Sequence, residues 1–485
     1  MSAKQLLLEA APDTALPGLQ VKFGSQAEGH PDLLDPMVVP VVSGLSLRSN
    51  FAWALAGNVV YAVCQWGMIV ALAKLGSSFM IGQFSLGLAI ATPVLMFTNL
   101  HLRAVQASDA RRFYSFGEYL QLRSVMTLAA IAVIGGIACL EHYERQTTMV
   151  ILAVALAKGI EALSDIHYGL FQLNDRLDHT GASMMLRGAF SVVALSAGLY
   201  LTRDIFWACV GLALVWLAAL LLFDFRRGRR FVALSEKFLQ PSRSRNSWPP
   251  EYRKNGFRRH WNLMRLALPL GLVTTMASIN LNMPRYFIAS RMGEHQLGIF
   301  SALAYATVAI TLVSDSLGQC AIPRMSRLYA SGQLAEFRSA LLQLSAIGAV
   351  LGLVGLAVAR IMGARLLAMF YSREYAAASQ VFIVLMLATA IHCVGGVLTS
   401  GIVSARCFRI QVPMFALVMG SSALACWRLV PTSGLAGGAL AMVVGAVVRL
   451  LLATAVVSYL FLVHAKHMAG HQVPDTRVDE WNSAL

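Results

Sequence analysis

The chain has 485 residues, of which 57% are hydrophobic and only 13% are charged. A soluble domain of this length needs far more charge to cover its surface, so the composition excludes an ordinary globular protein. The apolar residues fall in blocks of roughly 18–25, the length that a helix needs to cross about 30 Å of hydrocarbon. The period-two alternation of an outer-membrane barrel is absent. We therefore expect an all-α integral membrane protein.

Twelve transmembrane helices are predicted, in two pseudo-symmetric six-helix bundles around a central cavity. The segments are 51–72, 79–100, 121–140, 149–167, 184–201 and 205–223, then 262–284, 295–317, 339–360, 381–403, 411–428 and 434–463. The implied domains are a disordered cytoplasmic tail at 1–45, an N-terminal bundle at 46–224, a basic cytoplasmic linker at 225–260, a C-terminal bundle at 261–464 and a second cytoplasmic tail at 465–485. The first tail holds five prolines and no long apolar core, so it does not resemble a cleaved signal peptide.

The distribution of positive charge predicts the orientation of the chain. With the N-terminus in the cytoplasm, the cytoplasmic segments and their flanks hold 28 Lys and Arg residues, and the external connections hold nine. Cytoplasmic loops carry the excess of positive charge in membrane proteins, so both termini are expected inside. The net charge of +15 comes largely from the linker, which suits anionic lipid better than nucleic acid because no basic soluble domain is present.

Cofactor and metal sites are not expected. The seven cysteines form no CxxC pair, and most of them lie within apolar blocks. No glycine-rich phosphate loop follows a strand, so there is no ATP site, and energy would have to come from an ion gradient, from consumption of the product or from a partner.

The two halves resemble each other in sequence. The turn that contains Gly76, Gly82 and Ser85 recurs, with one residue deleted, as the turn that contains Gly293, Gly298 and Ser301. In this register Asn99 aligns with Asp315, and Arg111 aligns with Arg327. Six spans per half give both copies the same orientation, as in transporters built from parallel repeats, which enclose a path along the membrane normal.

These motifs resemble those of bacterial Wzx-type flippases, in the MATE-like multidrug/oligosaccharidyl-lipid/polysaccharide exporter superfamily. The residues that carry the resemblance lie in the Gly76–Ser85 turn, in 98–106, in 298–305, in 282–286 and in 321–324. The resemblance covers residues 46–464 and implies a V-shaped cavity between two bundles. It also implies translocation of undecaprenyl-pyrophosphate-linked oligosaccharide to the periplasmic leaflet of the bacterial inner membrane, for O-antigen or exopolysaccharide assembly. Membrane lipids, and a polysaccharide polymerase with other assembly proteins, would be the partners.

The fourth predicted span contains Lys158, Glu161 and Asp165 on one helical face. Ionisable groups are costly in a span and need a partner or an aqueous cavity. The set is either a ladder that holds helices together or a cavity lining that binds sugar or couples an ion. Since its net charge is −1, one carboxylate remains to bind a cation, take up a proton or pair elsewhere.

Arg285 is the candidate for binding pyrophosphate, because its forked guanidinium suits phosphate and Pro284 loosens the helix before it. The alternative is an Arg that extends to the periplasmic headgroups. Asn280 and Asn282 precede it, and Asn282 aligns with Gln65 in the other half. These amides are candidates for contact with sugar hydroxyls, or they connect helices.

The remaining candidates lie near the cytoplasmic ends of spans or within the last one. Arg103 and Arg324 would anchor the interface or capture pyrophosphate on the cytoplasmic side, and Asp315 belongs to the same region. Arg449 lies within the last span and must pair with an acid or face water. Together with Lys158, Glu161 and Asp165, Asp315 and Arg449 are the candidates for ion coupling or cavity charge.

Two other functions remain open. A cation-coupled exporter of small drugs shares the superfamily fold, but it would favour a compact acid-lined pocket with aromatic walls. A membrane-embedded glycosyltransferase or polymerase would need paired acids on a sizeable loop, which the short connections do not supply. The expectation is therefore a transporter with no catalytic residues.

Overall fold

The structure, a computed structural model, describes residues 45–109, 114–141, 143–239, 256–405, 407 and 410–468. These residues are almost entirely helical, and no strand occurs within the described ranges. The first half contains α1 (Leu47–Leu75), α2 (Ser78–Asn99), α3 (Leu102–Ser108), α4 (Phe116–Leu140), α5 (Arg145–Leu173), α6 (Leu177–Thr202), α7 (Ile205–Ala219), the π-helical turn η1 (Leu220–Phe225) and α8 (Arg226–Leu239). The second half contains α10 (Gly256–Ala306), α11 (Val308–Ala330), α12 (Leu334–Phe370), α13 (Arg373–Ala377), α14 (Ser379–Ser404) and α15 (Gln411–Met468).

The prediction of an all-α membrane protein is confirmed. Each of the twelve predicted segments falls on helix, apart from the break at Thr307 between α10 and α11. Among the described residues, eight helices are long and apolar enough to cross a membrane, and the bent pair of α10 and α11 provides a ninth. The count is below twelve partly because α15 contains two of the predicted segments, which are joined at Gly434 with a φ of 58°.

The predicted boundaries differ from the structure around the linker and the tails. The interval 225–260 is helical at its start, as α8, and again from Gly256. Residues 240–255 between these helices lie outside the described residues, as do nearly all of the predicted tails.

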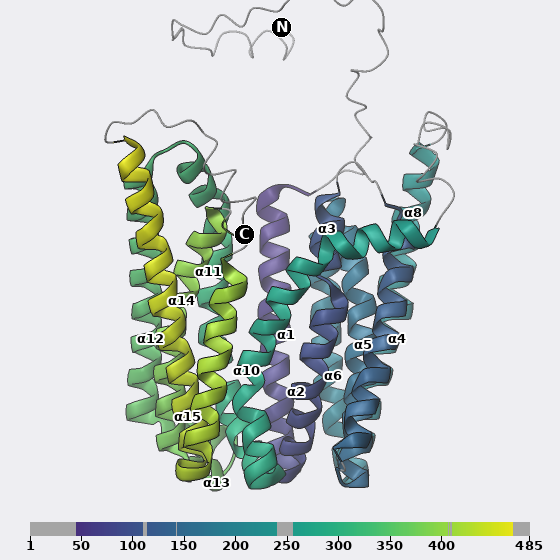
Figure 1. The fold of residues 1–485 in the computed structure, drawn as a ribbon. Coiled ribbons are helices and arrows are strands. Elements are labelled where there is room, and N and C mark those ends of the chain that lie inside the picture. The colour runs from purple at the N-terminus through teal and green to yellow at the C-terminus, as the bar shows by residue number, and fades with distance from the viewer. Residues whose placement is uncertain are drawn as a thin grey trace, which may run out of the picture. The chain divides into compact units, whose positions relative to one another are not determined.

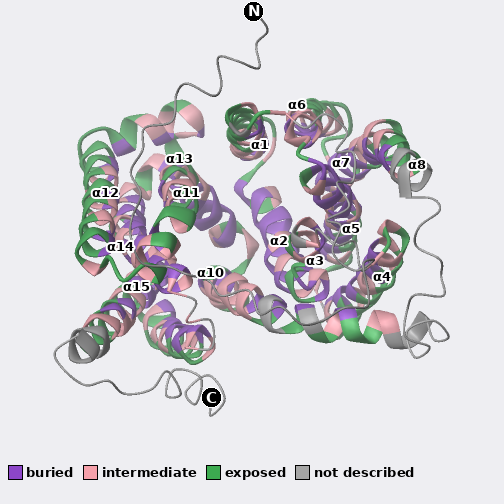
Figure 2. Cartoon of the chain, turned by 90° about the horizontal axis from the view of Figure 1, so that it is seen from above, coloured by how far each residue is buried: buried purple, intermediate pink, exposed green. Residues whose placement is uncertain are grey.

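The described helices run alongside one another within a single compact unit, residues 42–485. Helices α1–α8 lie on one side and α11–α15 on the other, and α10 lies between them and packs most extensively on α2 and α15 (Figures 1 and 2). We call the end at which α1 leads into α2, lower in Figure 1, the α1–α2 end. The opposite end, which holds α3, is the α2–α3 end.

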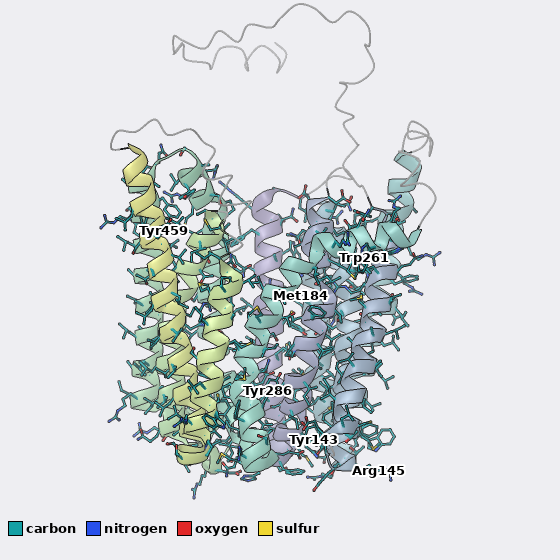
Figure 3. The ribbon with its side chains drawn as sticks, viewed as in Figure 1. Tyr143, Arg145, Met184, Trp261, Tyr286 and Tyr459 are labelled. Atoms are coloured by element: carbon teal, nitrogen blue, oxygen red, sulfur yellow. The ribbon has the colours of Figure 1, made fainter. Side chains whose placement is uncertain are left out.

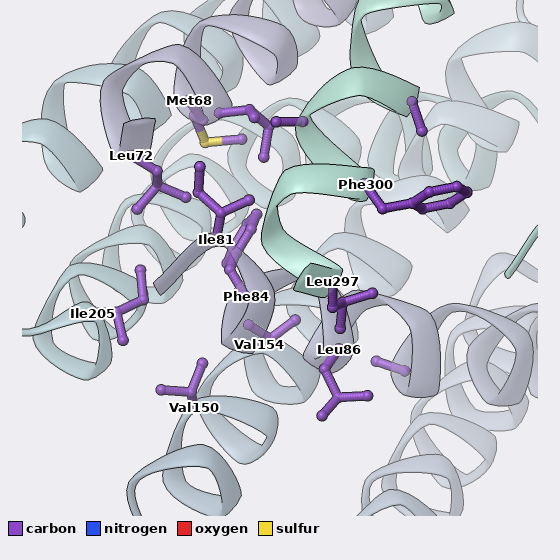
Figure 4. Close-up of a cluster of buried hydrophobic side chains, with 14 of the residues drawn as sticks. Met68, Leu72, Ile81, Phe84, Leu86, Val150, Val154, Ile205, Leu297 and Phe300 are labelled. Carbon is purple, nitrogen blue, oxygen red and sulfur yellow. The ribbon is translucent and has the colours of Figure 1, made fainter. Parts of the chain in front are cut away.

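The two sides share one hydrophobic core towards the α1–α2 end. Met68 and Leu72 of α1, Ile81 and Phe84 of α2, and Leu297 of α10 belong to this core and are almost fully buried (Figure 4). The same core extends to α12, α14 and α15. Burial of this much apolar surface is what joins the two sides.

The repeated glycines lie at the centre of this junction. A Cβ atom on Gly82 would lie 1.8 Å from the carbonyl oxygen of Glu294, and one on Gly298 would lie 1.7 Å from that of Ser78. In the sequence repeat, Gly82 aligns with Gly298 and Ser78 aligns with Glu294. The contact is therefore self-complementary, as at a twofold interface, and only glycine allows the two backbones to approach so closely.

Towards the α2–α3 end the cores are separate. Met325, Phe337 and Ile402 belong to a core formed by α10, α11, α12, α14 and α15. The start of α10 instead packs on the first half, where Leu263 and Ala267 join a core with residues of α3, α4 and α5. The described halves thus share a large core near the α1–α2 end, whereas near the α2–α3 end the start of α10 packs on the first half and α11, α12, α14 and α15 contribute to a separate core.

Candidate functional site

Lys158 and Glu161 form the centre of a polar network in the first half. Lys158 Nζ lies 2.6 Å from Glu161 Oε2, one turn away on α5. Glu161 also accepts a hydrogen bond from the hydroxyl of Tyr61 on α1 and lies 3.8 Å from Arg187 Nη1 on α6. The network therefore joins three helices, and Glu161 has two cationic neighbours.

Arg187 extends this network to the π-helical turn η1. Its Nη2 atom donates to the hydroxyl of Tyr168 at 2.6 Å and lies 3.4 Å from Oδ2 of Asp224, which is fully buried. The guanidinium lies 5.5 Å from the ring centre of Tyr168 and 5.7 Å from that of Trp216. Carboxylate, hydroxyl and aromatic faces together compensate a buried positive charge.

Asp165 pairs with two arginines from other helices. Its Oδ1 atom lies 3.3 Å from Arg103 Nη1, and its Oδ2 atom lies 3.1 Å from Arg123 Nη2. Lys158 pairs with Glu161, so Asp165 is the second carboxylate of the set, and it pairs with arginines on other helices. Pairing elsewhere is one of the three outcomes expected from the net charge of −1. Among the described residues of this network, four cations face three carboxylates: Arg103, Arg123, Lys158 and Arg187 against Glu161, Asp165 and Asp224.

In the second half, Arg449, His392 and Asp315 form a second polar cluster. Arg449 donates to Thr399 Oγ1 at 3.3 Å and to His392 Nδ1 at 3.2 Å. An Arg can only donate, so His392 Nδ1 must be the acceptor and Nε2 must carry the ring proton. Nε2 lies 3.8 Å from Oδ1 of Asp315. Arg449 therefore contacts Thr399 and His392 directly, and His392 connects it to the carboxylate of Asp315.

Arg285 lies inside the span rather than at its end. The helix around it continues to the turn at Gly293, eight residues or about 12 Å further on. The hydroxyl of the adjacent Tyr286 contacts the carbonyl of Ala89, about 16 Å along α2 from Ser78. Figure 3 places Tyr286 farther from the α1–α2 end than Tyr143 and Arg145. The predicted segment ends at 284, next to Arg285, whereas the helix continues to the turn at Gly293.

The guanidinium of Arg285 has polar and aromatic neighbours. Nη1 donates to Oδ1 of Asn282 at 2.6 Å, and the group lies 5.8 Å from the ring centre of Tyr305. Within the part of the chain that the structure describes, no carboxylate pairs with it, and its buried Nε atom has no hydrogen-bond partner. Arg285 thus differs from Arg123 and Arg187, each of which has a carboxylate within 4 Å.

The other candidates are dispersed. Among the described residues, Oδ1 of Asn280 and Nε2 of Gln65 are buried without a partner. Asn282 accepts from Arg285 and donates to the carbonyl of Ser278, and within the described chain no hydrogen bond joins it to Gln65. Arg324 is exposed. The structure thus brings together Arg285 with Asn282, Arg103 with Asp165, Lys158 with Glu161, and Arg449 with Asp315 through His392.

Polar contacts reinforce the junction at the α1–α2 end. Thr147 donates to Glu294 at 2.6 Å and accepts from Gln83 at 2.9 Å. Ser78 donates to Glu374 at 3.1 Å. Trp66 donates through Nε1 to the hydroxyl of Tyr371 at 2.9 Å. Together with the glycine contact, these bonds connect the two halves where they meet.

Sequence reasoning missed several members of the polar network. Arg123 and Arg187 were counted as cytoplasmic flanks, yet both are buried and paired. The available signal was their position, because Arg123 is the third residue of the predicted span 121–140 and Arg187 is the fourth residue of the predicted span 184–201. Tyr61 and Tyr168 gave no signal, since a Tyr in an apolar run is ordinary.

Comparisons with known proteins agree on the fold. No protein-family model matches the chain. It is 24% identical to the capsular polysaccharide biosynthesis protein CapF of Staphylococcus aureus over 83% of this chain and 97% of that protein. An inward-facing multidrug resistance MATE transporter of the MOP superfamily matches 87% of this chain and 97% of its own, with a TM-score of 0.55 and 13% identity. The lipid II flippase MurJ, in an inward closed conformation, matches 84% and 87%, with a TM-score of 0.60 and 11% identity.

The helices and the charges within them thus define a multi-span membrane protein. The chain has a fold similar to those of the MATE transporter of the MOP superfamily and of MurJ, and it is similar in sequence to a protein of capsular polysaccharide biosynthesis. The fold is the one that the resemblance of the motifs implies.

Proposed function

We propose that the chain is a flippase for undecaprenyl-pyrophosphate-linked oligosaccharide. It moves this substrate from the cytoplasmic to the periplasmic leaflet of the bacterial inner membrane, by alternating access between its two halves. The product serves O-antigen or exopolysaccharide assembly, and a polysaccharide polymerase is the expected partner. Both termini are cytoplasmic in this proposal, so the α2–α3 end faces the cytoplasm.

The observation that carries the proposal is the guanidinium of Arg285. It lies within a span and has no carboxylate partner among the described residues. A permanent charge at this depth costs several kcal/mol without compensation, so a substrate anion would stabilise it. Pyrophosphate is the strongly anionic part of a lipid-linked saccharide, and a guanidinium fork binds phosphate in bidentate geometry.

The unpartnered amides support a saccharide rather than a purely lipid substrate. Asn280 offers an acceptor and Gln65 a donor, each buried without a partner in the described chain. Buried polar atoms in native structures usually have a partner, and sugar hydroxyls both donate and accept. The amides would hold the saccharide while Arg285 and Asn282 hold the pyrophosphate.

The distribution of contacts supports alternating access. The halves share a core and several hydrogen bonds near the α1–α2 end, whereas near the α2–α3 end α11, α12, α14 and α15 contribute to a core separate from that of α3–α5 and the start of α10. In the proposed orientation this separation lies on the cytoplasmic side. We propose Lys158, Glu161 and Asp165, with Asp315 and Arg449, as the charges that couple movement to an ion gradient, and Arg324 as a cytoplasmic anchor for the headgroup.

The known proteins that resemble the chain support the same class of substrate. CapF is named for capsular polysaccharide biosynthesis and MurJ for flipping lipid II. A cation-coupled drug exporter is the second candidate, because MATE transporters share the fold. Arg285 argues against it, since an uncompensated guanidinium would repel a cationic drug.

The test replaces Arg285 in cells whose surface polysaccharide depends on this protein. Arg285→Ala should abolish surface polysaccharide at normal protein level, and Arg285→Lys should restore only part of it, because an ammonium replaces a bidentate fork. Loss of one charge-assisted contact weakens binding by roughly 1.5–3 kcal/mol, about tenfold to a hundredfold. Arg360→Ala is the matched control, because Arg360 is exposed on α12. Normal polysaccharide with Arg285→Ala would refute the phosphate role.

A further inference from the structure

Arg103 and Arg123 share a single carboxylate at the α2–α3 end of the first half. Both lie within 3.3 Å of Asp165, one on each carboxylate oxygen. Two guanidiniums with one carboxylate leave a net charge of +1, so the carboxylate neutralises only half of the charge that it contacts. The side chains of Arg103 and Asp165 remain 34% and 31% exposed, which leaves one side of the group open.

Arg123 is the unusual member of the group. Its side chain is fully buried, yet only Nη2 has a partner, and Nε and Nη1 make no hydrogen bond with any described residue. A buried donor without a partner costs roughly 1–3 kcal/mol, and more when the group is charged. Nε and Nη2 of a guanidinium form an edge that can bind two oxygens of a phosphate side by side, and in Arg123 Asp165 occupies only the Nη2 half of this edge.

The backbone before Arg103 is held in an uncommon conformation. Leu100 and His101, between α2 and α3, have φ values of 50° and 53°, in the left-handed region that residues other than glycine seldom adopt. Leu100 is fully buried in the core that includes the start of α10, which fixes this turn. As a result α3 begins next to α5, and the guanidinium of Arg103 lies against Asp165 and 5.5 Å from the ring centre of Tyr168.

We propose that Arg103 and Arg123 form a binding site for a phosphate or pyrophosphate group, distinct from Arg285, and that Asp165 stabilises the site while it is empty. The anion displaces Asp165 from Arg103, whose contact with Asp165 is the longer of the two, and from Nη2 of Arg123, and it then also binds the adjacent Nε. The identity of its source rests on the proposed function, which places this end in the cytoplasm, where a lipid-linked saccharide would first meet the protein. Arg103 and Arg123 then form a loading site, which binds the pyrophosphate before it reaches Arg285.

The test measures binding of inorganic pyrophosphate to the purified full chain by titration calorimetry and by the shift of its thermal unfolding. Arg103→Gln should weaken binding by about tenfold to a hundredfold, as expected for loss of one charge-assisted contact. Asp165→Asn should strengthen it by about tenfold, because a competing negative charge is removed. A purely structural ion pair predicts the opposite for Asp165→Asn, namely a destabilised protein that pyrophosphate does not rescue.

Arg176→Gln is the matched control, since Arg176 is also paired with an acid, Asp178, near the same end. It should bind pyrophosphate as the wild type does. The site would be overturned if the wild type, Arg103→Gln and Asp165→Asn bound pyrophosphate with equal affinity. It would also be overturned if Arg176→Gln weakened pyrophosphate binding as much as Arg103→Gln does. Arg123→Lys retains a buried charge but lacks the edge formed by Nε and Nη2, and it should bind as weakly as Arg103→Gln.

Competition in nanodiscs identifies the source of the phosphate. Displacement of pyrophosphate by undecaprenyl pyrophosphate, and not by phosphatidic acid, supports a loading site for the lipid-linked substrate. Displacement by phosphatidic acid alone overturns that role and assigns the site to a phospholipid headgroup. These results can be distinguished from failure of the proposed function. A protein that does not translocate lipid-linked saccharide would still bind pyrophosphate with an affinity that depends on Arg103 and Asp165.

Discussion

Gly298→Ala should force apart the junction between α2 and α10. A Cβ atom there would lie 1.7 Å from the carbonyl oxygen of Ser78, whereas such atoms do not approach within 3.0 Å. The helices must therefore separate by at least 1.3 Å, the difference between these two distances. The obstructing atoms belong to the backbone of Ser78 and Gly82, so no side-chain rotation relieves the clash.

The expected magnitude follows from the cost of overpacking. An extra methyl group in a close-packed junction costs about 1–3 kcal/mol, which corresponds to roughly a 5- to 150-fold shift away from the closed junction. The bond between Thr147 and Glu294, at 2.6 Å, lies in the same junction and should weaken with it. The protein should still fold, because the cores near the α2–α3 end do not include this contact.

The assay uses a cysteine at Ser301, one turn after Gly298 and fully buried, in a variant whose seven native cysteines are replaced. Its rate of reaction with a maleimide reports how often the junction opens. Gly298→Ala should raise the rate by about tenfold or more. Gly136→Ala is the matched control, because no atom lies within 4 Å of the position that its Cβ would occupy. Equal rates in the two variants would refute the account of the glycine contact.

Three further predictions concern buried charge, the linker and topology. Asp224→Ala should lower the stability of the protein by about 1–3 kcal/mol, because Arg187 then keeps only the longer of its two carboxylate contacts, with Glu161. Arg187→Met should recover part of this loss in thermal unfolding, and additive losses would contradict the pairing. Deletion within 240–255 should leave insertion and transport nearly intact, as a Pro- and Ser-rich linker has little to bury, and loss of folded protein would contradict this. Thiol labelling should place 366–378 outside and 230–255 inside the cell, and an external 230–255 would overturn the orientation.

The helices and the repeat could be predicted from the sequence because both depend on local patterns. Apolar length determines where a span can form, and all twelve predicted segments fall on helix. The repeat was recognised because the motif around Gly76, Gly82 and Ser85 recurs around Gly293, Gly298 and Ser301, but Gly82 and Gly298 lie within α2 and α10 rather than at the turns. Their direct contact across the junction could not be predicted, since it depends on how α2 and α10 pack rather than on either segment alone.

The partners of the charged residues were predicted less well. The spacing of Lys158 and Glu161 on one helix predicted their pairing, which the structure contains. The partners of Asp165 come from α3 and α4, and those of Arg449 from α14, and no local pattern identifies which helices will be neighbours. Arg123 and Arg187 were counted with the cytoplasmic flanks because the positive-inside rule counts every Arg near the end of a span. α4 and α6 begin five and seven residues before the predicted spans, at Phe116 and Leu177, which places both arginines well inside their helices.

The measurement that tests the proposed function most directly is translocation by the purified protein in proteoliposomes. Undecaprenyl-pyrophosphate-linked oligosaccharide is placed in one leaflet, and its appearance in the other is measured with a membrane-impermeant lectin. The proposal predicts translocation by the wild type and by Arg360→Ala, and none above the rate of empty liposomes by Arg285→Ala. A protein that leaves the lipid-linked saccharide in its original leaflet but exports a cationic drug would contradict the proposal.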